Sequence, residues 1–252
     1  MRMTGNTIFI TGGGSGIGRG LAEAFHTLGN TVIISGRRRE RLQAVLDANP
    51  GMAAIELDIT DPASIESAAA TLIAEHPALN MLINNAGIML LDHAEGPVDD
   101  ALALSTVTTN LLGPIRMTSA LVEHLKTQPD AVIANVSSVL GFVPMAVAAV
   151  YSSTKAALHS YTLSQRYLLR PHGIRLVEIA PPWVRTELLN SQEEERAIPL
   201  DQFIAEAMEQ LASGADEILV APAGAMRANP GPNEHAWVNQ FNDNVAAGPA
   251  LG

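Results

Sequence analysis

The amino-acid sequence predicts an α/β fold, in which helices cover both faces of a doubly wound parallel sheet. Short runs rich in β-branched residues alternate with longer stretches of helical periodicity. The short runs are apolar almost throughout, as strands are when both faces of a sheet are covered. The 252 residues contain no internal repeat and no low-complexity linker, so we expect a single domain over 1–252.

The strands and helices are expected in alternation along the chain. The predicted strands are Thr7–Ile10, Thr31–Ile34, Ala53–Leu57, Met81–Ile83, Ala131–Ala134 and Arg175–Ile179. The predicted helices are Gly18–Leu28, Glu40–Ala48, Pro62–Glu75, Asp99–Leu125, Tyr151–Arg170 and Pro199–Leu211. Glu217–Val220 fits either a closing strand or the end of a helix. From Ala221 onward the tail is rich in Ala, Gly, Pro and Asn, and the sequence does not determine its structure.

Composition and charge disfavour several classes of function. The formal net charge of −11 argues against binding to nucleic acid or to anionic membranes. No apolar run reaches the roughly 18 residues that cross a bilayer, and the run Ile8–Ile10 is too short for a signal peptide. Cysteine is absent, and the seven histidines are scattered without metal-ligand spacing. We therefore expect a cytoplasmic protein with no metal site.

A glycine-rich turn follows the first predicted strand. It reads Thr11-Gly-Gly-Gly-Ser-Gly-Ile-Gly18 and leads directly into a helical pattern. Glycines allow a sharp turn and a close approach to a pyrophosphate, and the helix N-terminus offers free amides. A flexible strand–helix turn is the alternative, but the position in the first βα unit favours a nucleotide site. We expect the nucleotide to contact Gly12, Ser15, Gly16, Ile17 and Gly18.

The turn and several later segments together resemble the short-chain dehydrogenase/reductase family. The other matching segments are Asp58, Asn84–Gly87, Asn110, Ser138, Tyr151-Ser-Ser-Thr-Lys155 and Pro181–Thr186. They occur in the family's order and extend over about three quarters of the chain. The resemblance implies a Rossmann-like single domain and a dehydrogenase or reductase that uses a nicotinamide cofactor.

The candidate catalytic pair is Tyr151 and Lys155. Their spacing of four places both on one face of a helix. A lysine ammonium and the positive nicotinamide of an oxidised cofactor would lower the tyrosine pKa, which suits acid/base catalysis. By resemblance, Ser138 binds the substrate oxygen, with Ser137 as a supporting neighbour. Also by resemblance, Asn110 holds a water next to Lys155.

The cofactor is expected to be NADP(H), with NAD(H) possible. Gly36 stands where NAD-preferring relatives carry an acidic residue, and Arg37 follows it with a planar fork that can pair with a 2′-phosphate. Arg39 and Arg41 are interpreted as solvated residues of a helix start. The resemblance further assigns the cofactor contacts Asp58, Ile59, Asn84, Ala86, Gly87, Tyr151, Lys155, Pro181, Val184 and Thr186.

The substrate is expected to be a hydrophobic ketone or its secondary alcohol. The apolar residues of loops at the catalytic edge are its candidate contacts. The residues proposed for this wall are Leu140, Phe142, Met145, Trp183 and Leu188, with Val139 and Leu189 beside them. The polar segment at about 187–205 is expected to close over the substrate as a lid.

The chain also departs from the family pattern. Pro182 stands where the family has glycine, which removes an amide donor beside the expected nicotinamide site. The tail from about residue 221 matches no usual family ending. The resemblance implies a homo-oligomer, a tetramer or dimer, formed through the two long central helices.

Two other functions remain open on the sequence alone. A non-catalytic NADP-binding regulator could share the scaffold, although such proteins typically lose the tyrosine or the lysine. Epimerases and dehydratases also carry the Tyr-x-x-x-Lys motif, but they are usually longer and have a substrate domain.

Overall fold

The computed structural model describes residues 1–228 and 232–248, so part of the predicted tail lies outside the described residues. The described chain forms a parallel sheet in the order β3-β2-β1-β4-β5-β6-β7. The strands are β1 (Thr7–Thr11), β2 (Thr31–Gly36), β3 (Ala53–Glu56), β4 (Leu79–Asn84), β5 (Val132–Val136), β6 (Arg175–Ile179) and β7 (Glu217–Ile218). The order reverses between β1 and β4, as a doubly wound fold requires.

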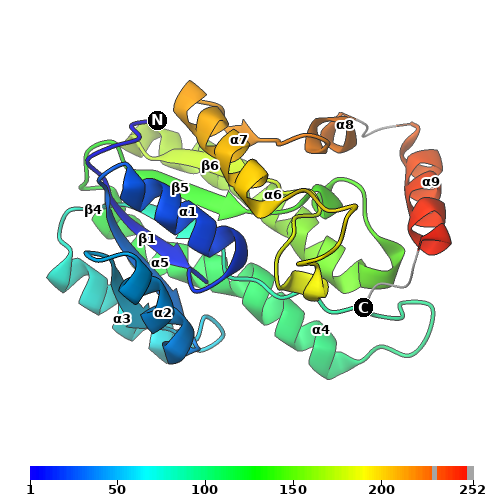
Figure 1. Ribbon diagram of the computed structural model, residues 1–252, viewed down its shortest axis with the longest axis horizontal. Helices are drawn as coiled ribbons and strands as arrows, with labels where there is room; N and C mark the ends of the chain where they lie inside the picture. Colours follow the sequence, from blue (N-terminus) through cyan, green and yellow to red (C-terminus); the bar gives the residue numbers. More distant parts are fainter. Residues whose placement is uncertain (229–231, 249–252) are drawn as a thin grey trace.

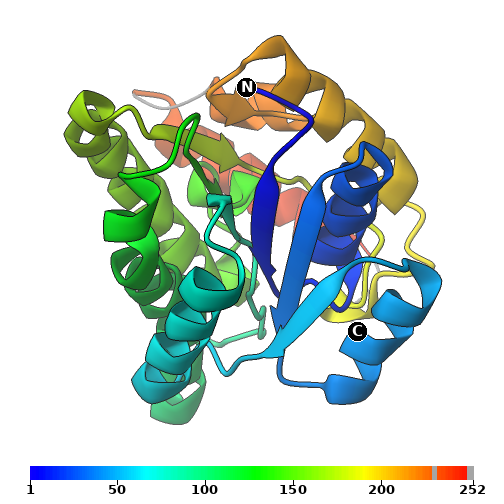
Figure 2. The same cartoon turned by 90° about the vertical axis from the view of Figure 1, so that its left-hand side faces the viewer.

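Helices cover both faces of the sheet (Figures 1 and 2). One face carries α1 (Gly16–Thr27), α2 (Arg39–Ala48) and α7 (Leu200–Ser213). The other carries α3 (Pro62–Glu75), α4 (Asp100–Val107), α5 (Gly113–Leu125) and α6 (Ala149–Leu169). Successive residues of β1 divide between the two cores, because Ile8 and Ile10 belong to the first and Phe9 to the second.

Local sequence explains several element boundaries. Helix α3 begins at Pro62 because the Asp61 carboxylate accepts hydrogen bonds from the amides of Ala63 and Ser64. Helix α7 ends at Gly214, whose φ of 86° is left-handed. Most predicted strands and helices appear within a few residues of their expected bounds.

Three elements differ from the sequence-based expectation. The predicted helix Asp99–Leu125 is interrupted by a π-helical turn at Thr108–Leu112, so that α4 and α5 are separate. Glu217–Ile218 is a strand, which decides between the two open alternatives. The tail contributes α8 (Ala223–Arg227) and α9 (Glu234–Ala247), and α9 lies at one end of the molecule (red in Figure 1).

No described helix is both long and apolar enough to cross a membrane.

Candidate active site

A cleft of about 700 Å³ opens at the carboxyl edge of the sheet. The loops that follow β1, β2, β4, β5 and β6 line it, as expected at the point where the strand order reverses. Most of the predicted site residues are brought together here. Those lining the cleft are Gly12, Ser15, Gly16, Ile17, Arg37, Ile59, Ala86, Gly87, Ser138, Leu140, Met145, Tyr151, Lys155, Pro181, Trp183, Val184, Thr186 and Leu188.

The glycine turn forms one wall of the cleft and leads into α1. Gly12 and Gly16 have φ of 68° and 53°, a backbone conformation that residues with a side chain rarely adopt. Gly18 is not at the cleft surface: it packs from behind, where a Cβ would lie 2.3 Å from Asn85 Nδ2. The Asn85 amide in turn donates to the carbonyls of Thr11 and Gly12. The turn is thus built by backbone packing against the loop after β4.

Asn84, predicted to contact the cofactor, is buried behind the cleft and does not line it. Its side chain donates to Thr118 Oγ1 at 3.0 Å and to Asn135 Oδ1 at 2.9 Å. Those bonds join β4 to β5 and α5. The structure therefore gives Asn84 a supporting position, and the neighbouring residues Ala86 and Gly87 reach the cleft.

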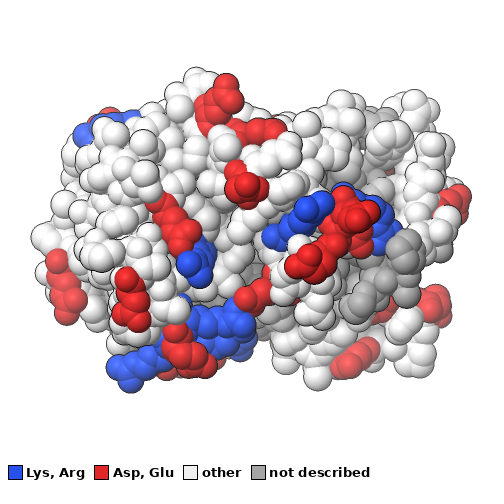
Figure 3. All heavy atoms as spheres, viewed as in Figure 1, with Lys and Arg blue, Asp and Glu red and all other residues white. Residues whose placement is uncertain are grey.

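Arginines gather where β2 ends and α2 begins, in the basic patch over α2 in Figure 3. Arg37, Arg38 and Arg41 line the cleft. Arg41 pairs with Glu187, and Arg38 Nη2 lies 3.8 Å from the second oxygen of the same carboxylate. Arg41 lies at the partly exposed helix start that was expected, but it also lines the cleft, which was not predicted. The three-residue spacing of Arg38 and Arg41, typical of one helix face, was the signal that could have found it.

Asp58 lies beside this region but does not line the cleft. Its carboxylate accepts hydrogen bonds from the Thr60 hydroxyl at 2.7 Å and from the Thr60 amide at 2.9 Å. These two bonds lower the pKa of Asp58, and the charge of Arg37 adds to the effect. The lining residues from the loop after β3 are Leu57, Ile59 and Thr60.

Tyr151, Ser138 and Lys155 meet at the other end of the cleft. Burial raises the pKa of Tyr151 to about 12, and the hydrogen bond with Ser138 acts in the opposite direction. Burial lowers the pKa of Lys155 to about 8, and the charge of Glu178 opposes that shift. Lys155 Nζ donates to the Val136 carbonyl at 2.9 Å and lies 5.5 Å from the centre of the Tyr151 ring.

The expected lowering of the Tyr151 pKa is not found in the free protein. Lys155 is not among the causes of its shift, and desolvation of the phenolate is the largest one. Tyr151 is therefore held as the neutral phenol, which is the form that can donate a proton.

Asn110 lies in the π-helical turn and supports the site from behind. Its side chain accepts from the Ile88 amide at 2.9 Å and donates to the Ile88 carbonyl at 2.8 Å. It thereby fixes the loop after β4, of which Gly87 and Ile88 line the cleft. The helix is distorted at this residue, because the π-helical turn Thr108–Leu112 includes Asn110.

The apolar wall of the cleft differs in part from the prediction. Phe142 does not line the cleft: its ring packs edge-on against His159, with the Arg227 guanidinium 5.0 Å from its centre. Apolar residues that the sequence did not single out complete the wall. They are Ile88, Met89, Leu90, Met226, Phe241 and Val245. The last three come from the tail, where no motif marks them.

The segment predicted as a lid, at about 187–205, runs into a helix at its end. Residues 200–205 belong to the first turns of α7, where Phe203 is fully buried. Two contacts fix the preceding segment to the loop after β6. Ile198 forms a β-bridge with Val184, and Ser191 Oγ accepts a hydrogen bond from Trp183 Nε1 at 2.8 Å. Only residues 187–199 are left as a covering segment. Pro182 lies in the cleft lining between Pro181 and Trp183, at the base of this segment.

Both the sequence and the fold are similar to those of known proteins. The family model described as short chain dehydrogenase matches residues 6–197. The chain is 36% identical over 224 residues to the uncharacterized oxidoreductase DltE of Bacillus subtilis (strain 168), covering 86% of this chain and 89% of that protein. It is 34% identical over 177 residues to the NADP-dependent 3-hydroxy acid dehydrogenase YdfG of Salmonella typhi, covering 69% and 71%.

Among solved structures, the fold matches a short chain dehydrogenase from Burkholderia cenocepacia J2315 in complex with NADP. The TM-score is 0.82, with 27% identity over 99% of this chain and 100% of that one. The family match, the order of the strands and the arrangement of the cleft agree with one another, and the chain belongs to the short-chain dehydrogenase family of oxidoreductases.

Proposed function

We propose that this protein is an NADP(H)-dependent carbonyl reductase and alcohol dehydrogenase that interconverts a hydrophobic ketone and its secondary alcohol. The observation that carries the proposal is a single cleft with two chemically distinct ends. Tyr151, Ser138 and Lys155 lie among apolar side chains at one end, and Arg37, Arg38 and Arg41 lie at the other.

The cleft fits a nicotinamide dinucleotide. The left-handed glycines leave the turn surface open to a pyrophosphate, and the first amides of α1 lack helical partners. The arginines suit a 2′-phosphate, which would replace the Glu187 carboxylate as their partner. Two relatives point the same way, since one is named NADP-dependent and another was solved with NADP.

The reaction assigns one proton transfer to the protein. When bound, the reduced cofactor supplies a hydride to the carbonyl carbon. Ser138 donates a hydrogen bond to the carbonyl oxygen, and Tyr151 transfers its phenolic proton to that oxygen as negative charge develops. The Lys155 ammonium stabilises the tyrosinate that remains. The apolar walls exclude water, and residues 187–199 cover the site as a lid.

NADPH absorbance with a panel of ketones tests the activity. The panel spans aliphatic ketones, aromatic ketones and, because of the YdfG relationship, 3-oxo acids, with NADH run in parallel. We expect consumption of NADPH with apolar ketones. Tight NADPH binding without turnover of any ketone would instead support a non-catalytic regulator.

Cofactor choice is tested by variants of the arginines. Arg37→Asp and Arg41→Ala each remove a positive charge beside the expected 2′-phosphate, so KM for NADPH should rise about tenfold or more while KM for NADH changes little. Arg39→Ala is the matched control, because Arg39 starts α2 but does not line the cleft. An unchanged preference in both cleft variants would remove the arginines as selectors.

A further inference from the structure

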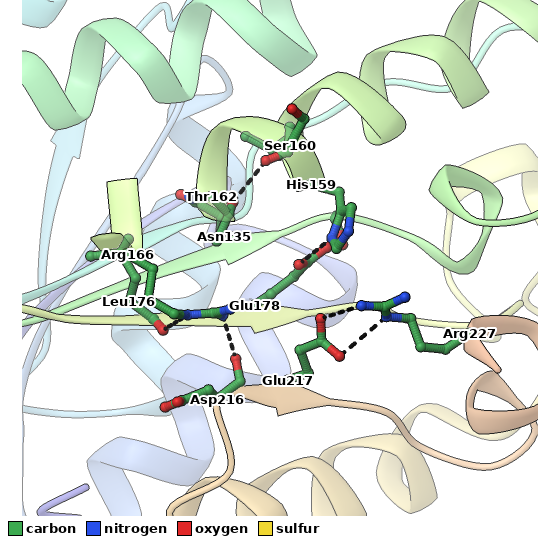
Figure 4. A network of polar contacts seen from close by, with 12 residues as sticks. Asn135, His159, Ser160, Thr162, Arg166, Leu176, Glu178, Asp216, Glu217 and Arg227 are labelled. Carbon is green, nitrogen blue, oxygen red and sulfur yellow. Dashed lines mark hydrogen bonds and ion pairs between the residues drawn. The ribbon is translucent and has the colours of Figure 1, made fainter. Parts of the chain in front are cut away.

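Behind the catalytic serine loop lies a buried carboxylate, that of Glu178 on β6. Glu178 is fully buried. Its Oε1 accepts a hydrogen bond from Ser137 Oγ at 2.5 Å. Its Oε2 lies 2.7 Å from His159 Nδ1, a contact shown in Figure 4. A buried carboxylate is costly unless its oxygens are engaged. Here the Ser137 hydroxyl donates to one oxygen, and His159 Nδ1 lies within hydrogen-bond distance of the other.

Ser137 connects this carboxylate to the active site. It directly precedes Ser138, and its amide donates to the Ile179 carbonyl at 2.8 Å. The Val139 amide donates to the Pro181 carbonyl at 3.1 Å. The backbone around Ser138 is thus fixed on one side to β6 and on the other to the loop that follows β6, and Glu178 holds it through the Ser137 side chain.

Glu178 also acts electrostatically on Lys155. Lys155 and His159 are four residues apart on α6 and face the same side. Burial lowers the pKa of Lys155 to about 8, and the Glu178 charge is the influence that raises it. The other charged groups facing Glu178 are Glu217 on β7 and Arg227 on α8. Arg227 donates to both oxygens of Glu217, at 3.1 and 3.2 Å, and offsets its charge.

A metal site is the competing interpretation of these groups. His159, Glu178 and Glu217 bring one ligand atom each to within 4.8 Å of one another. Yet Glu178 is engaged at one oxygen by the Ser137 hydroxyl and at the other by His159 Nδ1, and both oxygens of Glu217 accept from Arg227. Protein donors already satisfy the carboxylates that a cation would need, so the cluster is a closed network.

We propose that Glu178 is a positioning residue: it fixes Ser137 ahead of Ser138, and its negative charge holds Lys155 as the ammonium. The consequence for catalysis rests on the proposed function, whereas the effect on Lys155 does not. The two can therefore be measured separately.

Glu178→Gln isolates the charge. The amide oxygen can still accept from Ser137, and the amide NH₂ can donate to His159 in its other tautomer, so packing and hydrogen bonding are kept. Glu217→Gln is the matched control. It is the register partner of Glu178 on the neighbouring strand but makes no contact with Ser137.

The chain offers a direct readout, because Lys126 and Lys155 are its two lysines. In protein labelled with ¹³C/¹⁵N-lysine, each gives a separate side-chain NMR signal that can be followed through a pH titration without substrate. We expect wild-type Lys155 to titrate near pH 8, and at a clearly lower pH in Glu178→Gln. Lys126 in every protein, and Lys155 in Glu217→Gln, should be unmoved. An unshifted Lys155 in Glu178→Gln overturns the electrostatic part of the proposal.

Ser137→Ala tests whether the hydrogen bond from Ser137 to Glu178 positions Ser138. This test remains available if Glu178→Gln does not fold. We expect kcat to fall about tenfold at unchanged KM for NADPH, with Ser137→Thr restoring most of it. An unchanged kcat in Ser137→Ala overturns the positioning role. If the wild type reduces no ketone, the proposed function fails, and the lysine titration still judges Glu178.

Discussion

At the scale of single residues, burial controls the chemistry of the candidate site. Tyr151 is 6% exposed and Lys155 is 5% exposed, so the charged form of each is less favourable than it is in water. For Tyr151 this favours the proton donor that carbonyl reduction needs. For Lys155, burial makes the ammonium form unfavourable. The hydrogen bond to the Val136 carbonyl and the negative charge of Glu178 both favour the ammonium and so offset part of that cost.

Replacing Lys155 by methionine should therefore stabilise the protein while removing its activity. The pKa of Lys155 is about 8 in the folded protein, against 10.5 for an unperturbed lysine, a difference equivalent to about 3 kcal/mol at pH 7. Removing Lys155 also removes the hydrogen bond to the Val136 carbonyl, and the loss of that bond offsets part of this gain in stability. We expect Lys155→Met to raise the free energy of unfolding in urea by about 2 kcal/mol at pH 7.

The difference in the free energy of unfolding between Lys155→Met and the wild type should shrink as pH rises from 8 towards 10.5. Over this range the unfolded chain keeps a proton that the folded protein has released, so the stability of the wild type increases with pH. Lys126→Met, at a partly exposed lysine, is the control and should change little. A Lys155→Met protein less stable than the wild type at pH 7 would contradict this view of the site.

At the scale of elements, the turn between β1 and α1 depends on close backbone packing. Gly18 and Gly14 provide a matched comparison. A Cβ at Gly18 would lie 2.3 Å from Asn85 Nδ2 and 2.5 Å from the Gly12 carbonyl, whereas one at Gly14 would lie 3.5 Å from the nearest atom, the Arg41 Cβ.

Gly18→Ala should consequently lower the free energy of unfolding by about 1–3 kcal/mol and weaken NADPH binding, because the turn must shift. Gly14→Ala should be as stable as the wild type or slightly more stable, since alanine reduces the entropy of the unfolded chain. Thermal unfolding with and without NADPH measures both effects. Equal melting temperatures for the two variants would show that the turn adapts freely.

At the scale of the whole molecule, α6 exposes several large apolar side chains. Leu163, Tyr167 and Leu168 are 42%, 70% and 65% exposed, and Leu104 on the adjacent α4 is 63% exposed. Large exposed apolar groups on neighbouring helices are typical of interfaces. They support the expected homo-oligomer formed through the central helices.

Tyr167→Glu combined with Leu168→Glu should dissociate the oligomer, because two charges would be buried without partners at the contact. Sedimentation velocity distinguishes a monomer from a dimer or tetramer. Leu28→Glu is the control, since Leu28 is an exposed leucine at the end of α1 on the opposite face. A wild-type protein that sediments as a monomer at micromolar concentration would contradict the oligomer.

Much of the molecule could be predicted from the sequence because its signals are local. The glycine turn, the Tyr151–Lys155 spacing and the strand periodicity depend on a few neighbouring residues. Other features depend on contacts between distant segments: the packing of Phe142 against His159, the tail residues that line the cleft, and the pairing of Arg41 with Glu187. The raised pKa of Tyr151 in the free protein is a further example, since the desolvation of this side chain arises from the whole fold.

The proton transfer from Tyr151 is the central claim, and Tyr151→Phe tests it most directly. This variant keeps the buried ring and removes only the hydroxyl. With a ketone that the wild type reduces, kcat should fall by about a thousandfold while the Kd for NADPH, measured by fluorescence titration, stays within a few-fold of the wild-type value. A Tyr151→Phe protein that turns over at the wild-type rate would show that the proton comes from elsewhere.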